Sequence, residues 1–207
     1  METVEITLYS YADLADGAKA VARDWYRQGA LEYDWWETVY ADFEEVCERL
    51  GVSVIQRRRH GSSAQRPAIY FSGFSSQGDG ACFEAYYRYK KAGREAMRGY
   101  APKDLELHRI ADALFTVQRR NFYQLHAATS HRGRYYHEHC MTVDVGRRDV
   151  EMTADAEDEI AEALRDLARW LYRQLEAEHD YLLSDEAVDE SIAANEYRFR
   201  ASGAFWS

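Results

Sequence analysis

The chain has 207 residues, of which 46% are hydrophobic, and its 36 acidic and 26 basic side chains give a formal net charge of −10. This length and hydrophobic content suit one globular domain, whereas no apolar run approaches the roughly 18 residues of a membrane helix. The start of the chain lacks the basic and then apolar order of a secretory signal, so we expect a cytoplasmic protein without a membrane partner. Three widely spaced cysteines fit neither a disulfide framework nor a zinc motif of paired cysteines.

The first 50 residues predict one short strand and two helices. Residues 5–9 alternate like a strand, and apolar residues then recur at helical spacing from residue 10 to residue 25. A second helix is predicted over residues 34–50, because its first residues match a capping box and a glycine follows its end. Trp35 and Trp36 lie on the apolar stripe of that helix, so we expect them in the core.

The stretch from Ala68 to Tyr89 predicts a β-hairpin at the centre of the fold. Two strand-like runs are joined by Ser75-Ser-Gln-Gly-Asp-Gly80, whose glycines and aspartate permit the positive φ angles of a tight connection. A further strand is predicted over residues 51–58. It should pair antiparallel with the first arm of the hairpin, which begins near Pro67.

The middle of the chain predicts two helices followed by a second pair of strands. A short helix or an irregular link is expected over residues 92–100 and a longer helix over residues 102–119. Residues 121–130 and 134–145 then alternate on either side of a three-residue turn that contains glycine. The expected register pairs Leu125 with His139 and Ala127 with His137.

The C-terminal part predicts a long helix from Thr153, a short helix that restarts at Ser184, and a strand or an extended tail near Tyr197. From Asp155 to Glu190 there are 13 carboxylates and 3 arginines, a balance of −10, while the rest of the chain holds 23 acidic and 23 basic residues. Such an acidic segment should repel nucleic acid and attract basic protein surfaces.

Together these patterns predict a single α+β domain over residues 1–207. We expect one antiparallel sheet of about five strands packed against amphipathic helices. The acidic helical segment, residues 153–195, should pack on that sheet. The chain contains no internal repeat, low-complexity tract or proline-rich linker that would mark a second domain.

Five strings carry a resemblance to a known family. They are Asp34-Trp-Trp-Glu37, Phe71-Ser-Gly-Phe-Ser-Ser-Gln-Gly-Asp-Gly-Ala-Cys-Phe83, Gly133-Arg-Tyr135 with His137 and Cys140-Met141, Tyr181-Leu-Leu-Ser-Asp-Glu186, and Asn195-Glu-Tyr197. Together they resemble a family of phage and prophage proteins, some of which are labelled "antitoxin of toxin-antitoxin stability system". In that family a Trp often stands where Ser75 is, and a small residue often stands near His139. The resemblance implies a mobile-element setting and no particular reaction.

The glycine-rich turn offers one candidate ligand site. Consecutive N–H groups around Ser76, Gln77 and Asp79 could bind an anion. The turn lacks the Gly-Lys-Ser/Thr ending of a P-loop, and a strand-like run follows it where a helix would be needed. A structural turn is therefore the favoured interpretation.

His137-Glu-His-Cys140 offers a second candidate site. Strand alternation would place His137 and His139 on one face, which can present two imidazoles to a metal ion. A metal site needs three or four ligands, and the third would have to come from His108 or Asp79, so we expect no metal and no cofactor. Acid–base or nucleophilic chemistry using these residues or Cys140 stays open, although no known catalytic motif surrounds them.

The leading functional hypothesis is a noncatalytic interaction protein of a phage or prophage. It would be antitoxin-like or act against host defence, binding a host or toxin protein with a basic surface. Its acidic helix could even mimic the phosphates of DNA; the partner-binding candidates are Asp155, Glu159, Glu162 and Asp166. Nucleic acid itself is not expected as a partner, since only the strip Arg57 to Arg59 favours it.

The alternative hypothesis is a small-molecule or nucleotide-binding protein, with or without catalysis. Its pocket would lie between the glycine-rich turn and the strand that carries His137, where basic residues near the sheet favour a phosphorylated ligand. The ligand-binding candidates are Ser76, Gln77, Asp79, His108 and His137.

Overall fold

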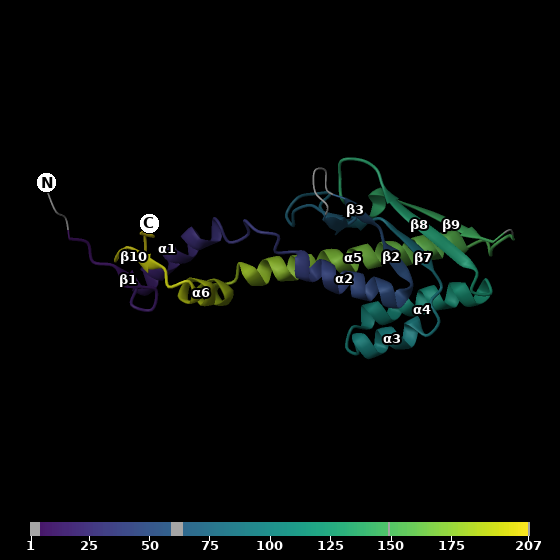
Figure 1. The fold of residues 1–207 in the computed structure, drawn as a ribbon, viewed down its shortest axis with the longest axis horizontal. Coiled ribbons are helices and arrows are strands. Elements are labelled where there is room, and N and C mark those ends of the chain that lie inside the picture. Colours follow the sequence, from purple (N-terminus) through teal and green to yellow (C-terminus); the bar gives the residue numbers. More distant parts are fainter. Residues whose placement is uncertain (1–4, 59–63, 149, 207) are drawn as a thin grey trace. The chain divides into compact units, whose positions relative to one another are not determined.

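The structure is a computed structural model with an α+β fold, shown in Figure 1. It forms two compact units: unit 1 combines residues 1–36 with residues 177–207, and unit 2 is residues 37–176. The single domain expected over residues 1–207 stays a prediction, and each unit is described by itself. The structure describes residues 5–58, 64–148 and 150–206.

Unit 2 is built around a four-stranded antiparallel sheet. Its strand order is β2-β7-β8-β9. In β7, Ala85 and Tyr87 are buried whereas Tyr86 and Arg88 are exposed, so one face of the sheet packs against the interior and the other faces solvent. The bounds of the strands are β2 Val52–Val54, β7 Ala85–Arg88, β8 Leu125–His131 and β9 Met141–Arg147.

Four helices contribute to the core of unit 2. The Phe43 ring of α2 lies 5.2 Å from the Phe83 ring and 6.5 Å from the Trp170 ring of α5. Buried Gln118 of α4 donates hydrogen bonds to the Tyr87 hydroxyl and the Leu125 carbonyl, which ties this helix to β7 and β8. Figure 1 shows α4 beside α3. The helices are α2 (Glu37–Leu50), α3 (Gly93–Tyr100), α4 (Leu105–Arg120) and α5 (Ala156–Leu182), the last of which continues into unit 1.

The expected single sheet of about five strands is corrected by the structure, and the predicted hairpin is confirmed only as a short pair, β5 with β6, that lies outside the four-stranded sheet instead of at its centre. Two further antiparallel pairs of unit 2 form separate two-stranded sheets in the described residues. The run from residue 81 to residue 89 is divided at Glu84, whose N–H donates to Ala68 and whose carbonyl accepts from Ile55. The chain therefore changes partners there. The pairs are β3 (Gln56–Arg58) with β4 (Gln65–Pro67), and β5 (Ile69–Phe71) with β6 (Ala81–Phe83).

The predicted register of the second strand pair is wrong by eight residues. Leu125 pairs with Arg147, where the sequence predicted His139, and Ala127 pairs with Val145. Residues 132–140 form the connection, and the predicted strand around His137 does not exist. The connection packs against β5, because the Tyr136 ring stacks on the Tyr70 ring with 5.4 Å between their centroids. Within the connection, residues 138–140 form a 3-10 helix, η1 (Glu138–Cys140).

Unit 1 pairs the two ends of the chain. Strand β1 (Tyr9–Ser10) lies antiparallel to β10 (Arg198–Phe199), and both pack with α1 (Asp16–Arg27) and α6 (Asp185–Ala194). Gly203 has φ +86°, and a Cβ there would lie 2.0 Å from the Ala18 carbonyl oxygen, so only glycine fits this close approach. The buried core is Tyr11, Leu14, Ala18, Ala22, Val188, Ile192 and Phe199.

Most predicted helices are confirmed, with shifts at their ends. Trp35 and Trp36 precede α2 instead of lying within it, although Trp35 is buried as expected. The strand predicted over residues 5–9 is reduced to β1. Arg59 of the proposed basic strip lies outside the described residues. Over the ranges that the structure describes, no helix has the length and hydrophobicity needed to cross a bilayer.

Candidate functional site

The glycine-rich turn of residues 72–80 is held by its own aspartate. One carboxylate oxygen of Asp79, Oδ2, accepts from the N–H groups of Ser75 at 3.1 Å and Ser76 at 2.7 Å. The Ser72 N–H donates to the Gly80 carbonyl across the base of the turn at 3.1 Å. Amides that an anion nest would present are thus already bonded to Asp79, which supports the structural interpretation of this turn.

The end of the turn lies against the segment that carries His137. A Cβ on Gly80 would lie 3.0 Å from both the His137 Cα and the Tyr136 carbonyl oxygen, so a larger residue would push the two segments apart. On its other side, the turn receives a 2.9 Å hydrogen bond from the Tyr172 hydroxyl of α5 to the Gly73 carbonyl. Burial, followed by the Asp79 charge, raises the Tyr172 pKa.

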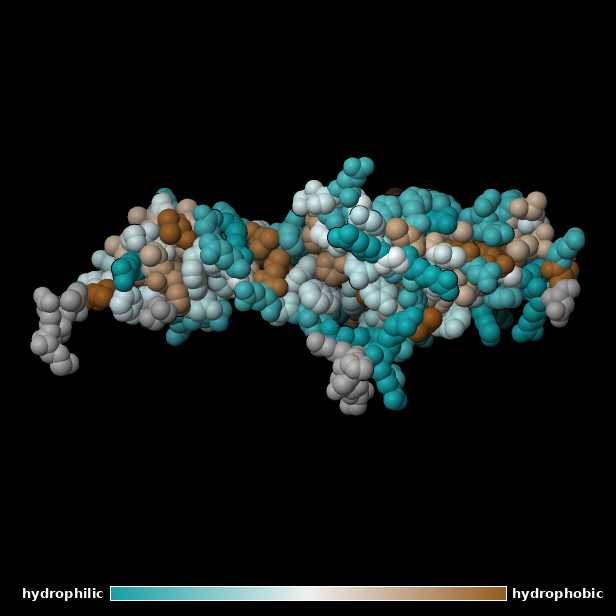
Figure 2. All heavy atoms as spheres, turned by 90° about the horizontal axis from the view of Figure 1, so that it is seen from above, coloured by the Kyte–Doolittle hydropathy of each residue, from teal (hydrophilic) through white to brown (hydrophobic). Residues whose placement is uncertain are grey.

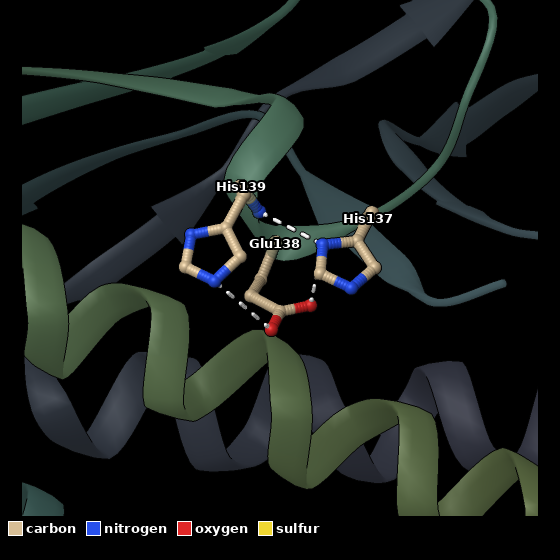
Figure 3. A group of neighbouring side chains, drawn as sticks. All are labelled: His137, Glu138 and His139. Carbon is tan, nitrogen blue, oxygen red and sulfur yellow. Dashed lines mark hydrogen bonds and ion pairs between the residues drawn. The ribbon is translucent and has the colours of Figure 1, made fainter. Parts of the chain in front are cut away.

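Three consecutive residues, His137, Glu138 and His139, form a cluster beside this turn (Figure 3). The two imidazole rings lie 5.3 Å apart, and Figure 3 shows them on either side of the Glu138 carboxylate. Oε2 of Glu138 is 3.1 Å from His137 Nδ1, and Oε1 is 3.8 Å from His139 Nε2. One ligand atom from each residue lies within 4.8 Å of the others, so the cluster has the residue types and spacing of a metal site.

The 3-10 helix explains why the three side chains meet. The His137 side chain caps η1 by accepting from the His139 N–H at 3.2 Å. Strand alternation would have sent Glu138 to the opposite face, so sequence reasoning missed it as the third member. Glu138 is 9% exposed, and Arg169 of α5 contacts its Oε1 at 3.4 Å.

The predicted ligand residues do not all converge. Asp79 and His137 are brought close through Gly80, whereas Ser76 and Gln77 are exposed on the turn. His108 hydrogen-bonds through Nε2 to the Ala101 carbonyl at 2.9 Å, so it stabilises the connection between α3 and α4. His108 is therefore not a ligand shared with the cluster.

The buried thiols are poor nucleophiles. Burial raises the pKa of Cys82 to about 12, and burial also raises the pKa of Cys47 well above the usual value. A thiol must lose its proton to attack or to bind a metal. Neither cysteine therefore supports covalent chemistry at neutral pH.

Each of the four predicted partner-binding carboxylates pairs with arginine in unit 2. Asp155 and Glu159 contact Arg120 of α4. Glu162 and Asp166 contact Arg169 one or two turns further along α5. These four carboxylates of the acidic helical segment therefore belong to a network of ion pairs rather than to an uncompensated acidic face.

Asp166 is the most buried of these four. It is 8% exposed, and Arg109 of α4 approaches its other oxygen at 2.7 Å. Burial alone would raise the Asp166 pKa, but hydrogen bonds from Arg109 and Arg169 outweigh it and hold the pKa below its usual value. Asp166 thus joins α4 to α5, and it is poorly placed to meet another protein.

Unit 1 carries nearly all of the net charge. Its two segments contain 14 carboxylates and 5 basic residues, a formal charge of −9, whereas unit 2 contains 22 and 21, a formal charge of −1. Arg23 bonds both oxygens of Asp189 at 2.6 Å and also contacts Asp185. Within the described part of unit 1, several other carboxylates have no ion-pair partner, among them Asp16, Glu32, Glu178, Glu186, Glu190 and Glu196.

Comparison with known proteins identifies a family and no function. No curated protein and no solved structure matches the chain significantly. Residues 35–185 match a family model described as "Domain of unknown function (DUF8835)", a region that includes the glycine-rich turn, the His137 cluster and all of unit 2. The chain therefore belongs to the DUF8835 family.

Proposed function

We propose that this chain is a noncatalytic binding protein that holds a partner protein through the acidic surface of unit 1. The observation that carries the proposal is the division of charge, with −9 on unit 1 and −1 on unit 2. Carboxylates without ion-pair partners attract a basic surface and steer its approach, whereas those already bonded to arginine contribute little. The binding surface is thus expected around α1 and α6, beyond the four α5 residues predicted from sequence.

The exposed residues of α6 fit this role. Glu186 and Glu190 are one helical turn apart and exposed, and Asp16 begins the neighbouring helix α1. The neighbouring Arg23 is bonded to Asp189 and Asp185, so its charge does not offset theirs. A basic patch on a partner could therefore pair with several carboxylates at once.

The biological setting rests on resemblance. Strings such as residues 71–83 resemble phage and prophage proteins, which supports an antitoxin-like or counter-defence role against a host or toxin protein in the cytoplasm. The acidic surface disfavours nucleic acid as the partner, because phosphates and carboxylates repel each other. On unit 2, Figure 2 shows hydrophobic side chains as separate patches among hydrophilic ones on the face in view, so this face of unit 2 offers no continuous hydrophobic surface as a competing binding site.

Charge reversal with a matched control tests the proposal. The variant Glu186→Lys with Glu190→Lys removes exposed charges that have no ion-pair partner on α6. The control Glu157→Lys with Asp158→Lys makes the same change of charge in the first turn of α5, where both residues are also exposed and without an ion-pair partner among the described residues. Wild-type chain and both variants are immobilised and exposed to host lysate at low salt, and the captured proteins are identified and quantified by mass spectrometry.

We expect a basic partner to be recovered with the wild type and the control and lost with the α6 variant. Raising the salt concentration should weaken the wild-type capture, because screening acts on exposed charges. Equal recovery by the wild type and the α6 variant would contradict the role of unit 1. If the partner were lost only when Asp155, Glu159 and Glu162 are replaced, the binding surface would lie on α5 in unit 2 instead.

A small-molecule site is the second candidate, and one groove favours it. A groove of ≈ 490 Å³ is lined by two arginines, His126 and aromatic side chains, and an adjoining groove of ≈ 250 Å³ shares Arg88 and His126. These cations suit a phosphorylated ligand, although they lie apart from the glycine-rich turn of the original hypothesis. Calorimetric titration with ATP should then show binding that Arg88→Ala weakens and Arg134→Ala does not; an absence of heat would end this candidate.

A further inference from the structure

We propose that His137, Glu138 and His139 bind one divalent transition-metal ion such as Zn²⁺. The sequence argued against a metal because two histidines on a strand lacked a third ligand. The structure supplies that ligand as Glu138, since η1 replaces the expected strand and turns the carboxylate toward both imidazoles (Figure 3). The inference is independent of the proposed partner surface, which lies in unit 1.

The spacing fits a single small ion. With metal–ligand bonds of about 2.0–2.2 Å, two ligand atoms of one ion lie about 3–4 Å apart. The Glu138 oxygens lie 3.1 Å from a nitrogen of His137 and 3.8 Å from a nitrogen of His139. These two distances run to the two oxygens of one carboxylate, and one ligand atom from each residue lies within 4.8 Å of the others, so side-chain rotations that close these gaps would direct all three residues at one ion.

His137 Nδ1 faces two groups with opposite requirements. The His139 N–H donates to it at 3.2 Å, which needs an unprotonated nitrogen, while Glu138 Oε2 at 3.1 Å can only accept. Without an ion, one of these contacts is unsatisfied, whichever proton state the ring adopts. A bound cation removes the repulsion between the Nδ1 lone pair and the carboxylate, because both can be directed at a positive charge, and the His139 N–H then gives up Nδ1 as its acceptor.

Arg169 does not replace the ion. Its contact with Glu138 Oε1 is long, 3.4 Å, whereas it lies 2.5 Å from Asp166 and also pairs with Glu162. Two closer carboxylates thus balance its charge. Glu138 Oε2 remains available for a metal, and Arg169 serves as the outer partner that orients the carboxylate.

The ligand set indicates the class of metal and the accessibility of the site. Imidazole and carboxylate together suit zinc and its neighbours in the first transition row better than calcium or magnesium, which prefer oxygen ligands alone. The His139 side chain is 66% exposed, so an ion can enter from solvent. Three protein ligands leave at least one coordination position for water or for a group from a ligand.

Metal titration of the full chain tests the proposal. The metal-free protein is titrated with ZnCl₂ by calorimetry near neutral pH, and Co²⁺ absorption reports the coordination geometry. We expect one ion per chain, and binding that weakens as the pH is lowered because protons compete for the imidazole nitrogens. His139→Ala should weaken Zn²⁺ binding by about tenfold or more. His139 is exposed, so this variant keeps the fold, which circular dichroism verifies.

Matched variants separate this site from other zinc ligands. His126→Ala removes an exposed histidine of β8, and Cys140→Ser removes the thiol next to the cluster. Both should bind Zn²⁺ as the wild type does, while Glu138→Gln should bind more weakly. The proposal is overturned if no ion binds at one per chain, or if binding survives His139→Ala and Glu138→Gln but is lost with Cys140→Ser.

Discussion

Unit 1 and unit 2 both contain helices rich in carboxylates, yet the surroundings of these carboxylates differ between the two units. In unit 2, carboxylates of α5 meet arginines of α4, as Asp166 meets Arg109 and Glu159 meets Arg120. In unit 1, the arginines that form ion pairs among the described residues are Arg23 and Arg27, and several exposed carboxylates, such as Glu186 and Glu190, have no ion-pair partner there. Similar composition on two helices can therefore give an internal network in one place and a charged surface in another.

The two units also differ in how much apolar surface supports them. Unit 2 has a sheet with helices packed against it, whereas unit 1 is made of two segments of 36 and 31 residues around one aromatic cluster. Small cores are less able to offset the entropy of folding. We therefore expect unit 1 to be the less stable of the two and the more sensitive to a single lost side chain.

Removing one phenylalanine from each core gives the largest expected effect. Phe199 and Phe43 are both 0% exposed, and each contacts other aromatic rings of its own unit. Phe199→Ala or Phe43→Ala should each cost about 3–5 kcal/mol of unfolding free energy. Hydrogen exchange measured by mass spectrometry should show that Phe199→Ala abolishes protection in unit 1 and leaves unit 2 protected.

The reciprocal variant is the control for that comparison. Phe43→Ala should lower protection across unit 2, because its ring lies between Phe83 and Trp170. If Phe199→Ala instead exposed both units together, the two units would unfold as one, and the expected difference in stability would be wrong.

The local elements were predictable because their signals are local. The hairpin from β5 to β6 is connected by a turn whose glycine and aspartate content marks it, and α6 begins at Ser184, whose side chain accepts from the Ala187 N–H as a capping residue should. The four-stranded sheet was not predictable in detail, because the change of partners at Glu84 depends on Ala68 and Ile55 from other strands.

Only part of the His137 cluster was predicted, again because the missing part depends on the local backbone structure. His137 and His139 were found from their residue type, but Glu138 was assigned to the wrong face, since period-two alternation does not apply to a 3-10 helix. Which carboxylates are neutralised by arginine could not be predicted from the sequence either. Arg109 and Arg120 stand more than 30 residues from the carboxylates that they neutralise, so only the packing of α4 on α5 shows the pairing.

Neutralising Asp166 should have an intermediate effect that shows the network of unit 2 to be structural. Asp166→Asn leaves Arg109 and Arg169 without their shared carboxylate and should cost about 1–3 kcal/mol, since the group is largely buried and receives hydrogen bonds from both. Asp155→Asn is the matched control, because Asp155 is exposed and, among the basic residues that the structure describes, pairs only with Arg120. Urea unfolding should separate the variants; equal destabilisation would mean that burial does not distinguish the two pairs.

The smallest predicted effect depends on pH and tests the ion pair of unit 1. Hydrogen bonds from Arg23 hold the Asp189 pKa below its usual value, and the bond from Tyr11 adds to this. A lowered folded-state pKa means that the stabilisation is present above the unfolded value of about 3.9 and is lost as the pH falls through the folded value. Asp189→Asn should therefore lower the unfolding free energy by about 1 kcal/mol near neutral pH. The expected effect is small because Asp189 is about one-third exposed and solvent screens the pair. The difference in stability from the wild type should shrink as the pH is lowered. Glu186→Gln is the control, because it removes a carboxylate without an ion-pair partner among the described residues, and it should not lower the unfolding free energy. If the stability difference between Asp189→Asn and the wild type did not change with pH, the ion pair would be excluded as its cause.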